Sequence, residues 1–171
     1  DETPLPGETP QATAERLAVE KARAVAESHT AAINRIEAIA DAVAQAEFPE
    51  PLDEACEVMA NAIQAANAKI YAKSVEVGAQ MGSTFVGLVV RGNEFVVLWS
   101  GDSRAYVFRD GHLIQLTTDH TQVQAMIDRG LLTPEEALTH PMRHVLARAV
   151  GVEEDLQIDA VRDIVEPRDL F

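Results

Sequence analysis

Residues 82–116, GSTFVGLVVRGNEFVVLWSGDSRAYVFRDGHLIQL, contain the pattern that decides the fold. Within them, residues 83–90 and 94–99 are rich in β-branched and aromatic side chains, which favour strands. The three residues between these segments, Arg-Gly-Asn, tolerate the positive φ angles of a tight turn. The sequence therefore predicts an antiparallel hairpin, and its near-continuous apolarity predicts that both faces of the two strands are covered.

A second hairpin is predicted directly after the first. Residues 105–109 and 112–116 flank Asp110-Gly111, a two-residue sequence that favours the turn of a β-hairpin. Further along the chain, residues 156–161 alternate between apolar and polar side chains and predict another strand. Residues 168–171 predict a turn that leads into the start of one more strand. These segments together favour a fold built on antiparallel strands.

Helices are predicted ahead of the strands. Residues 11–46 are alanine-rich without proline or glycine, so they predict one long helix, or two helices broken near residues 28–30. The sequence Phe48-Pro49-Glu50-Pro51 ends this region, because each proline disfavours helical dihedrals in the residue before it. Residues 52–70 then place apolar side chains at every third or fourth position. We expect these helices to cover the strands.

Residues 121–150 predict a compact helical insertion between strands, which we call the flap. Gly130 is placed to end a first short helix, and the Thr-Pro-Glu-Glu sequence at residues 133–136 carries the signals that start a second. A third short helix is predicted from about Met142 to Gly151. The apolar side chains expected to hold the flap in place are Val123, Met126, Ile127, Leu131, Leu132, Leu138, Val145 and Leu146.

The composition argues against several classes of partner. The formal charge is −14, from 28 acidic and 14 basic residues, so the surface repels nucleic-acid phosphates and anionic lipids. No apolar run approaches the ~20 residues that span a bilayer, and the start of the chain lacks the basic region of a signal peptide. Cys56 is the only cysteine, which excludes an intramolecular disulfide and predicts a buried thiol. We expect a cytoplasmic protein that binds neither nucleic acid nor a membrane.

The sequence MGST at residues 81–84 and WSGDSRAY at residues 99–106 resemble the "GTT … GDSRAY" core of bacterial metal-dependent protein phosphatases, the PPM or type 2C family. The segments that follow keep that family's order and nearly its spacing: RDG at 109–111, LTTDH at 116–120, TPEE at 133–136, HP at 140–141 and VG at 150–151. The resemblance runs from Gly82 to Gly151. More loosely, AERLAVE at residues 14–20 looks like the family's first covering helix.

The resemblance implies a fold, an activity and a cofactor. The expected fold class is α+β, a partial four-layer αββα sandwich of antiparallel sheets with a helical flap, formed by residues 1–171 as a single phosphatase-like domain. In that family two Mn²⁺ or Mg²⁺ ions activate a bridging water, which attacks phosphoserine or phosphothreonine in proteins. The implied partners are phosphoproteins, the substrates of a bacterial serine/threonine kinase.

Asp102 is the candidate metal ligand, because the resemblance places the GDSR aspartate near the metal cluster, where in bacterial members it can bind a third ion. The alternative is that Asp102 only closes the turn after a strand, through nearby backbone amides. Ser103 and Arg104 are expected to support this turn. His120 and His140 are expected to be part of the flap scaffold. No catalytic side chain and no residue for an organic cofactor is assigned.

The chain departs from the family pattern at the motifs that carry the metal ions. The family's early arginine and aspartate, its "DGMGG" loop and its late "SDG" and "DN" aspartates have no counterparts here. Asp1 and Phe171 both fall beside missing motifs, so we expect an incomplete domain whose parent protein is the enzyme. The alternative is a catalytically inactive pseudophosphatase that acts as a regulatory or binding module. A third reading, an unrelated α+β interaction protein, would require the whole motif series to be coincidental.

Overall fold

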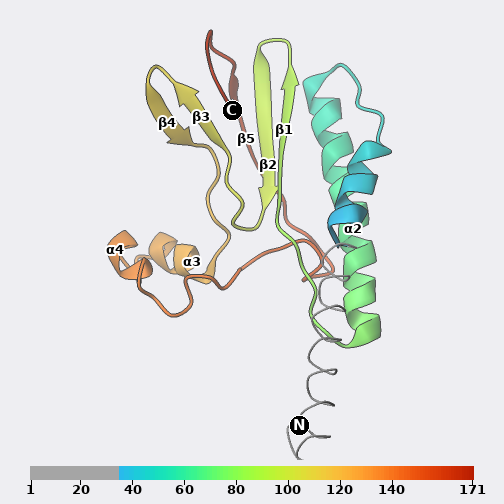
Figure 1. The fold of residues 1–171 in the computed structure, drawn as a ribbon, viewed down its shortest axis with the longest axis vertical. Coiled ribbons are helices and arrows are strands. Elements are labelled where there is room, and N and C mark those ends of the chain that lie inside the picture. Colours follow the sequence, from blue (N-terminus) through green and yellow to red (C-terminus); the bar gives the residue numbers. More distant parts are fainter. Residues whose placement is uncertain (1–34) are drawn as a thin grey trace, which may run out of the picture. The chain divides into compact units, whose positions relative to one another are not determined.

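The structure, a computed structural model, describes residues 35–171 of the chain, which divides into two compact units, Asp1–Glu37 and Ala38–Phe171. Most of the helix predicted over residues 11–46 lies outside the described residues, but residues 35–44 are helical. The second unit contains, in order, α2 (Leu52–Val77), β1 (Phe85–Arg91), β2 (Glu94–Ser100), β3 (Tyr106–Arg109), β4 (His112–Gln115), α3 (Gln122–Asp128), α4 (Pro134–Ala137) and β5 (Asp159–Ile164) (Figure 1).

Both predicted hairpins are present, and all strand pairs are antiparallel. β1 and β2 pair from Phe85 opposite Ser100 to Arg91 opposite Glu94. β3 and β4 form a separate two-stranded sheet. Asp110, between them, has a φ of 49° and the glycine after it a φ of 81°, which are the two positive angles that a type I′ turn requires. The local turn chemistry therefore predicted these elements correctly.

β5 completes a three-stranded sheet in the order β1-β2-β5. The strand predicted over residues 156–161 is displaced in the structure to residues 159–164, where it pairs with β2 from Trp99 opposite Asp159 to Glu94 opposite Ile164. Leu156 instead packs into the core ahead of the ladder, and its carbonyl accepts a hydrogen bond of 2.7 Å from the Gln64 amide. The alternating pattern fits several registers, and only the partner strand selects one of them.

α2 lies alongside β1 and covers one face of the three-stranded sheet (Figure 1). It extends further than the predicted residues 52–70 and ends at Gly78, whose φ of 65° is the left-handed conformation common after a helix. Its buried face supplies Leu52, Ala55, Met59, Ile63, Ala66 and Ile70. Opposite them, the sheet supplies Phe85, Val89, Val96 and Leu98. Among residues 35–171 no helix is long and apolar enough to cross a membrane.

Cys56 does not fulfil the prediction of a buried thiol. It lies at the edge of the buried face of α2 and is only half-buried. Burial, followed by the nearby charge of Asp53, raises the pKa of its thiol above the ordinary value. A raised pKa keeps the thiol protonated and less nucleophilic, which agrees with the absence of a predicted catalytic role.

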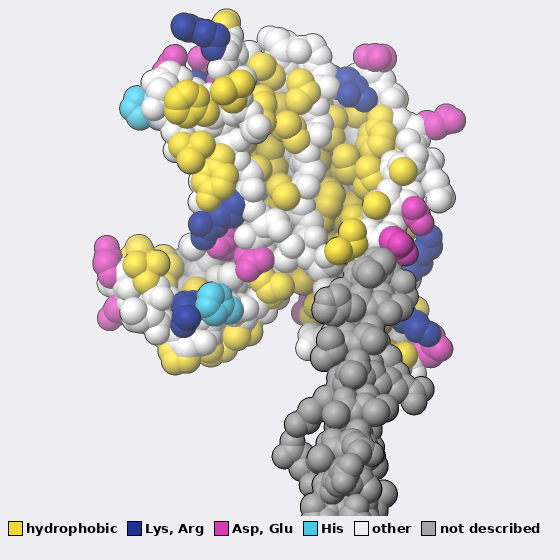
Figure 2. Space-filling model, in the orientation of Figure 1, with side chains coloured by type: hydrophobic (Ala, Val, Ile, Leu, Met, Phe, Trp, Pro, Cys, Tyr) yellow, Lys and Arg dark blue, Asp and Glu magenta, His cyan; other side chains and the backbone are white. Residues whose placement is uncertain are grey.

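The opposite face of the sheet corrects a second prediction. β2 is buried on both faces as expected, with Phe95, Val97 and Trp99 forming a second apolar cluster. β1 is not, because Val86, Leu88 and Val90 stay 37%, 41% and 39% exposed among the described residues. β1 is an edge strand of this sheet, whereas β2 has a neighbour on each side. Figure 2 shows the hydrophobic side chains that gather over the sheet.

The flap contains two of its three predicted helices. α3 begins after Thr121, whose hydroxyl accepts a hydrogen bond from the Gln124 amide, and α4 has the predicted capping box between Thr133 and Glu136. The helix predicted from Met142 to Gly151 is wrong: residues 141–144 form a turn, and the chain then becomes extended. The physical reason is that backbone groups of residues 145–147 bond to the start of the flap, where they cannot also serve a helix.

The apolar residues that hold the flap also differ from the prediction in part. Val123 and Ala137 are buried, and the second of these was not predicted. Leu131, Leu138 and Val145 were expected to pack but are 69%, 76% and 44% exposed. α3 and α4 contact each other, so the flap is held by a small contact between its two helices and by the backbone bonds at its base.

Candidate functional site

The candidate site is the turn that follows β2, at residues 101–104. β2 ends at Ser100, and Gly101 reverses the chain with a φ of 112°. A side chain at Gly101 would overlap Thr84, which lies directly behind the turn. The hydroxyl groups of Thr84 and Ser103 share a hydrogen bond of 2.7 Å. The turn is therefore supported by the residue that precedes β1, as the sequence predicted for Ser103.

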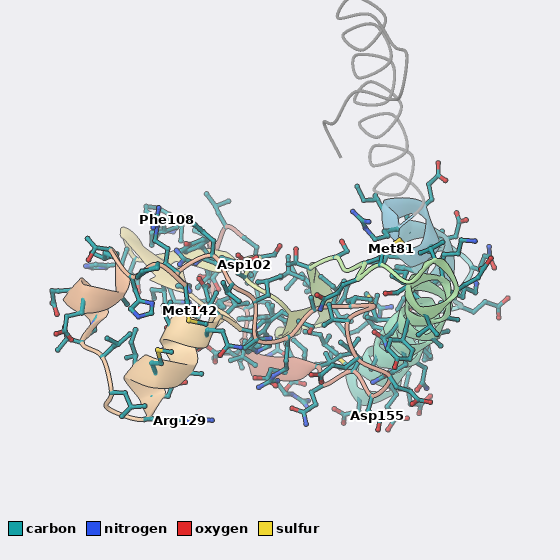
Figure 3. The ribbon with its side chains drawn as sticks, turned by 90° about the horizontal axis from the view of Figure 1, so that it is seen from below. Met81, Asp102, Phe108, Arg129, Met142 and Asp155 are labelled. Atoms are coloured by element: carbon teal, nitrogen blue, oxygen red, sulfur yellow. The ribbon has the colours of Figure 1, made fainter. Side chains whose placement is uncertain are left out.

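Asp102 is exposed at the tip of this turn. The bonds that fix the turn come from its neighbours Gly101, Ser103 and Arg104, so the carboxylate of Asp102 is presented outward. Figure 3 labels Asp102 with the flap residue Met142 on one side and Met81, near α2, on the other. This placement leaves the carboxylate accessible to a ligand.

Arg104 joins the turn to the segment that leads into the flap. Its guanidinium donates two hydrogen bonds of 2.7 Å to the two carboxylate oxygens of Asp119. The hydrogen bonds to Asp119 raise the pKa of Arg104 above its ordinary value, so the ion pair persists over the whole pH range in which the carboxylate is charged. Arg104 therefore supports the turn, as predicted, and it does so through a carboxylate that sequence reasoning did not identify as its partner.

His120 is buried beneath the same turn. The backbone N–H of Gly101 donates to Nδ1 of His120 at 3.1 Å, and Nε2 of the ring lies 3.1 Å from Oδ2 of Asp159. Because Nδ1 accepts a hydrogen bond, Nε2 carries the ring proton and donates it to the carboxylate. The ring also stacks on Trp99, with the ring centroids 5.9 Å apart. This geometry agrees with the predicted scaffold role of His120.

Asp159, the first residue of β5, lies at the far side of His120. Its second oxygen accepts a hydrogen bond of 2.8 Å from Arg148. Burial alone would raise the pKa of Asp159, but the hydrogen bonds from Arg148 and His120 hold it below its ordinary value. Asp159 is therefore ionised at neutral pH and balances the cationic Arg148. The alternating pattern that predicts this strand gives no indication that Asp159 pairs with His120 and Arg148. Sequence analysis therefore did not identify Asp159 or Arg148 as part of the site.

A pocket of about 460 Å³ lies between the turn and the flap. Its polar wall includes Asp102, Arg104 and Asp119 from the turn side, together with Arg143 and His144 from the flap. The rest of the lining is formed by Thr121, Val123, Gln124, Ile127, Pro134, Ala137 and Leu138. His140 does not line this pocket; it lies in the flap turn, where its Nδ1 accepts a hydrogen bond from the Met142 amide.

The described residues do not by themselves fit a divalent metal ion. Mn²⁺ and Mg²⁺ are hard cations that take about six oxygen ligands, usually including several carboxylates. Among residues 35–171, no three histidine, cysteine, aspartate or glutamate side chains come together in a group that could hold an ion. Asp102 offers a single exposed carboxylate, which is at most one ligand of such a site. Its role as a metal ligand stays a prediction.

Comparison with known proteins places the chain in a family. The family model of protein phosphatase 2C matches residues 9–125. The chain is 38% identical over 116 residues to the serine/threonine protein phosphatase PstP of Mycobacterium tuberculosis. The matched region covers 66% of this chain and 22% of PstP. The chain thus spans about a fifth of that relative.

Solved structures agree with the sequence match. PppA of Pseudomonas aeruginosa, described as a key regulatory component of T6SS, superimposes with a TM-score of 0.70 at 31% identity, over 78% of this chain and 54% of PppA. The catalytic domain of PstP in complex with two manganese ions gives a TM-score of 0.60 at 29% identity, over 82% of this chain and 57% of that domain. These neighbours share the α+β fold. The chain therefore belongs to the protein phosphatase 2C family, whose members depend on Mn²⁺ or Mg²⁺.

Proposed function

We propose that the protein carrying this chain is a metal-dependent phosphatase that hydrolyses phosphoserine and phosphothreonine in proteins. The observation that carries the proposal is the match of the protein phosphatase 2C family over residues 9–125, which includes the Asp102 turn. The exposed Asp102 borders a pocket that is also lined by the cationic Arg143 of the flap. A phosphorylated side chain could therefore approach the turn from the side of the flap.

Asp102 is proposed to contribute one oxygen ligand to a Mn²⁺ or Mg²⁺ ion, with the remaining ligands supplied by residues outside the described set. When bound, such an ion would polarise the phosphate and supply an activated water. The described residues would hold the turn. Thr84 and Ser103 support it from behind, and the Arg104–Asp119 pair joins it to the segment that leads into the flap. The substrates would be phosphoproteins of a bacterial serine/threonine kinase, in the cytoplasm, with no nucleic-acid or membrane partner.

The direct test is release of phosphate from a phosphothreonine peptide by the purified protein that carries this chain, with Mn²⁺ added or chelated. We expect release that depends on Mn²⁺ and that falls at least tenfold in Asp102→Asn, with Asp110→Asn as the matched control in an exposed turn of β3–β4. Absence of release in the presence of Mn²⁺ would sink the proposal. An unchanged metal dependence in Asp102→Asn would remove the role of Asp102 alone.

A second candidate is a catalytically inactive module that binds phosphoproteins without hydrolysing them. The observation that favours it is the lack of a metal-binding cluster among residues 35–171. The two candidates separate in one experiment, because a binding module would retain a phosphothreonine peptide in the presence of Mn²⁺ and release no phosphate. The phosphatase would bind the same peptide only transiently and convert it.

A further inference from the structure

His120 is a junction between three parts of the structure. Its backbone N–H donates a hydrogen bond of 3.0 Å to the carbonyl of Gly101, and its carbonyl accepts one of 2.7 Å from the N–H of Ala147. Its Nδ1 accepts a hydrogen bond of 3.1 Å from the N–H of Gly101, the other backbone polar group of that residue. One residue thus satisfies both backbone polar groups of Gly101, the residue directly before Asp102.

The same residue holds both ends of the flap. Thr121, which caps α3, follows His120 directly and forms an isolated bridge with Leu146 near the end of the flap. Ala147, bonded to the carbonyl of His120, lies one residue further. A displacement of the flap relative to the sheet must therefore break these bonds or carry His120 with it.

The ring of His120 is also anchored on its far side. Nε2 donates to Asp159 of β5, and Asp159 in turn accepts from Arg148, the residue after Ala147. The side chain of His120 is only 5% exposed, so its ring is shielded from bulk water, whereas Asp159 and Arg148 are 43% and 31% exposed. The chain of contacts Arg148–Asp159–His120–Gly101 runs from the end of the flap, through the sheet, to the Asp102 turn.

We propose that His120 is a positioning residue that couples the flap to the Asp102 turn, so that the two change position together. The observation that carries the proposal is that one buried side chain and its own backbone bond the turn, the end of the flap and β5 at the same time. The coupling follows from these contacts alone. Only its consequence for catalysis, an orientation of Asp102 that depends on the flap, rests on the proposed phosphatase function.

The competing explanation is that His120 merely fills space against Trp99, and three substitutions separate the two. His120→Phe keeps the planar ring and the stacking on Trp99 but loses both ring hydrogen bonds. His120→Asn keeps an acceptor close to the position of Nδ1, and His120→Gln keeps a donor close to the position of Nε2. His112→Ala, at an exposed histidine of β4, is the matched control.

The first measurement is the tautomer of His120, read from ¹⁵N NMR of the full chain. The structure requires a proton on Nε2 and none on Nδ1, because Nδ1 accepts from the Gly101 amide. A ring that fills space has no such requirement. Detection of the proton on Nδ1 would overturn the proposal.

The second measurement is amide hydrogen exchange at Gly101 and Ala147 in the full chain, without peptide or metal. In His120→Phe we expect exchange at both amides to rise together, by roughly tenfold, because each lies in the same junction. His120→Asn should restore protection at Gly101, and His112→Ala should change neither amide. A change at Gly101 without one at Ala147 would show that the turn and the flap are not coupled, and no change at either would show that His120 positions neither.

A milder variant covers the case in which His120→Phe fails to fold. Asp159→Asn leaves His120 and Gly101 intact and weakens the link to Arg148. We expect the Gly101 amide, which Asp159 does not touch, to shift in the NMR spectrum and to exchange faster; an unchanged Gly101 amide contradicts the coupling. Neither measurement uses phosphatase activity, so the two proposals are tested separately. An inactive protein would contradict the proposed function without affecting the proposed coupling. A result against the coupling would likewise leave the proposed function unaffected.

Discussion

At the scale of single residues, Ser100 has a buried hydroxyl that costs stability. Its side chain is fully buried at the end of β2, and its Oγ has no hydrogen-bond partner among the described residues. Burial of an unpaired hydroxyl costs about 1–3 kcal/mol. Ser103, in contrast, shares its hydroxyl with Thr84. The two serines lie close in the sequence, but only the Ser103 hydroxyl has a hydrogen-bond partner among the described residues.

We therefore expect Ser100→Ala to leave the free energy of unfolding unchanged or to raise it by up to about 1 kcal/mol, because it removes an unpaired polar group. Ser103→Ala should lower the free energy of unfolding by about 1 kcal/mol, since it leaves the Thr84 hydroxyl without this bond. The measurement is denaturant unfolding followed by the fluorescence of Trp99, the only tryptophan. A loss in Ser100→Ala as large as that in Ser103→Ala would show that Ser100 has a partner, such as a buried water.

Two separate features of the structure disfavour a side chain at the position of Gly151. Its φ of 87° lies in the region that disfavours side chains, and a Cβ there would overlap the side chain of Ile70 on α2, approaching its Cβ to 2.8 Å. The Gly151 amide also donates a hydrogen bond of 2.6 Å to the buried Asn67 side chain, so the backbone cannot move away. Gly78, after α2, has a φ of 65°, but a Cβ added there would meet no atom within 4 Å.

We expect Gly78→Ala to lower the free energy of unfolding by about 1–2 kcal/mol, which is the cost of the left-handed conformation alone. Gly151→Ala should cost this amount and a further 1–3 kcal/mol, roughly, for overpacking against Ile70. Chemical denaturation of both variants against the unmodified chain measures the difference. Equal losses of unfolding free energy in the two variants would mean that the loop after the flap moves away from Ile70 freely. That result would contradict the anchoring of Gly151 by Asn67.

At the scale of elements, the flap and the sheet differ in how firmly they are held. β2 is buried on both faces, whereas α3 and α4 are short helices with one buried residue each. Short helices are marginal without docking, so their amides open at lower free energy than those of central strands. We expect amide exchange to be faster in residues 121–150 than in β2 and in those amides of β1 that bond to β2. Equal protection would show that the flap is not a separately opening element.

The capping box of α4 allows a sharper test of the same element. The Thr133 hydroxyl accepts from the Glu136 amide, and the Glu136 carboxylate accepts from the Thr133 amide at 2.8 Å. Thr133→Ala removes the first bond, which is worth about 1 kcal/mol at a helix start. Exchange of the α4 amides should then rise roughly fivefold while β2 stays unchanged. Thr118→Ala, at an exposed threonine outside α4, is the control. A similar rise of α4 exchange in that variant would contradict the capping argument.

At the scale of the whole molecule, Arg109 joins β3 to the end of the described chain. Its guanidinium donates two hydrogen bonds to Asp169, of 3.0 and 2.8 Å, and also contacts Asp163 and Glu166. The side chain of Asp169 is 1% exposed. The hydrogen bonds from Arg109 hold the pKa of Asp169 below its ordinary value. Asp159 has a lowered pKa as well, because Arg148 and His120 donate hydrogen bonds to it.

These two carboxylates predict how stability depends on pH. A carboxyl group with a folded-state pKa below its unfolded value of about 3.9 contributes stability that is complete above that value and is lost as the pH falls through the folded pKa. The free energy of unfolding should therefore fall below about pH 5. Asp169→Asn should lower stability at pH 7 and reduce the acid-dependent loss, whereas Asp110→Asn should leave that loss unchanged. Unfolding curves from pH 7 to pH 3 measure this, and an equal acid loss in Asp169→Asn would contradict it.

The features that sequence alone could predict are those whose contacts are local. The Asp110-Gly111 turn, the Thr133 capping box and the two hairpins depend on residues a few positions apart, so the chain itself supplies every partner. The Asp102 turn was likewise identified from its sequence motif, and its support by Ser103 and Arg104 was expected. The hairpin and capping predictions hold because their hydrogen bonds form within one element. The Asp102 turn is different, because its supporting partners Thr84 and Asp119 lie 19 and 15 positions from Ser103 and Arg104, and only the structure identifies them.

Tertiary structure decided the features whose partners lie far apart along the chain. The register of β5 depends on its pairing with β2. The helix expected from Met142 does not form, because the backbone of this segment bonds to residues at the start of the flap. The link between His120 and Asp159 spans 39 positions, and the bond from Asn67 to Gly151 spans 84. No local pattern encodes such pairs, because burial and packing select them only after the elements have come together.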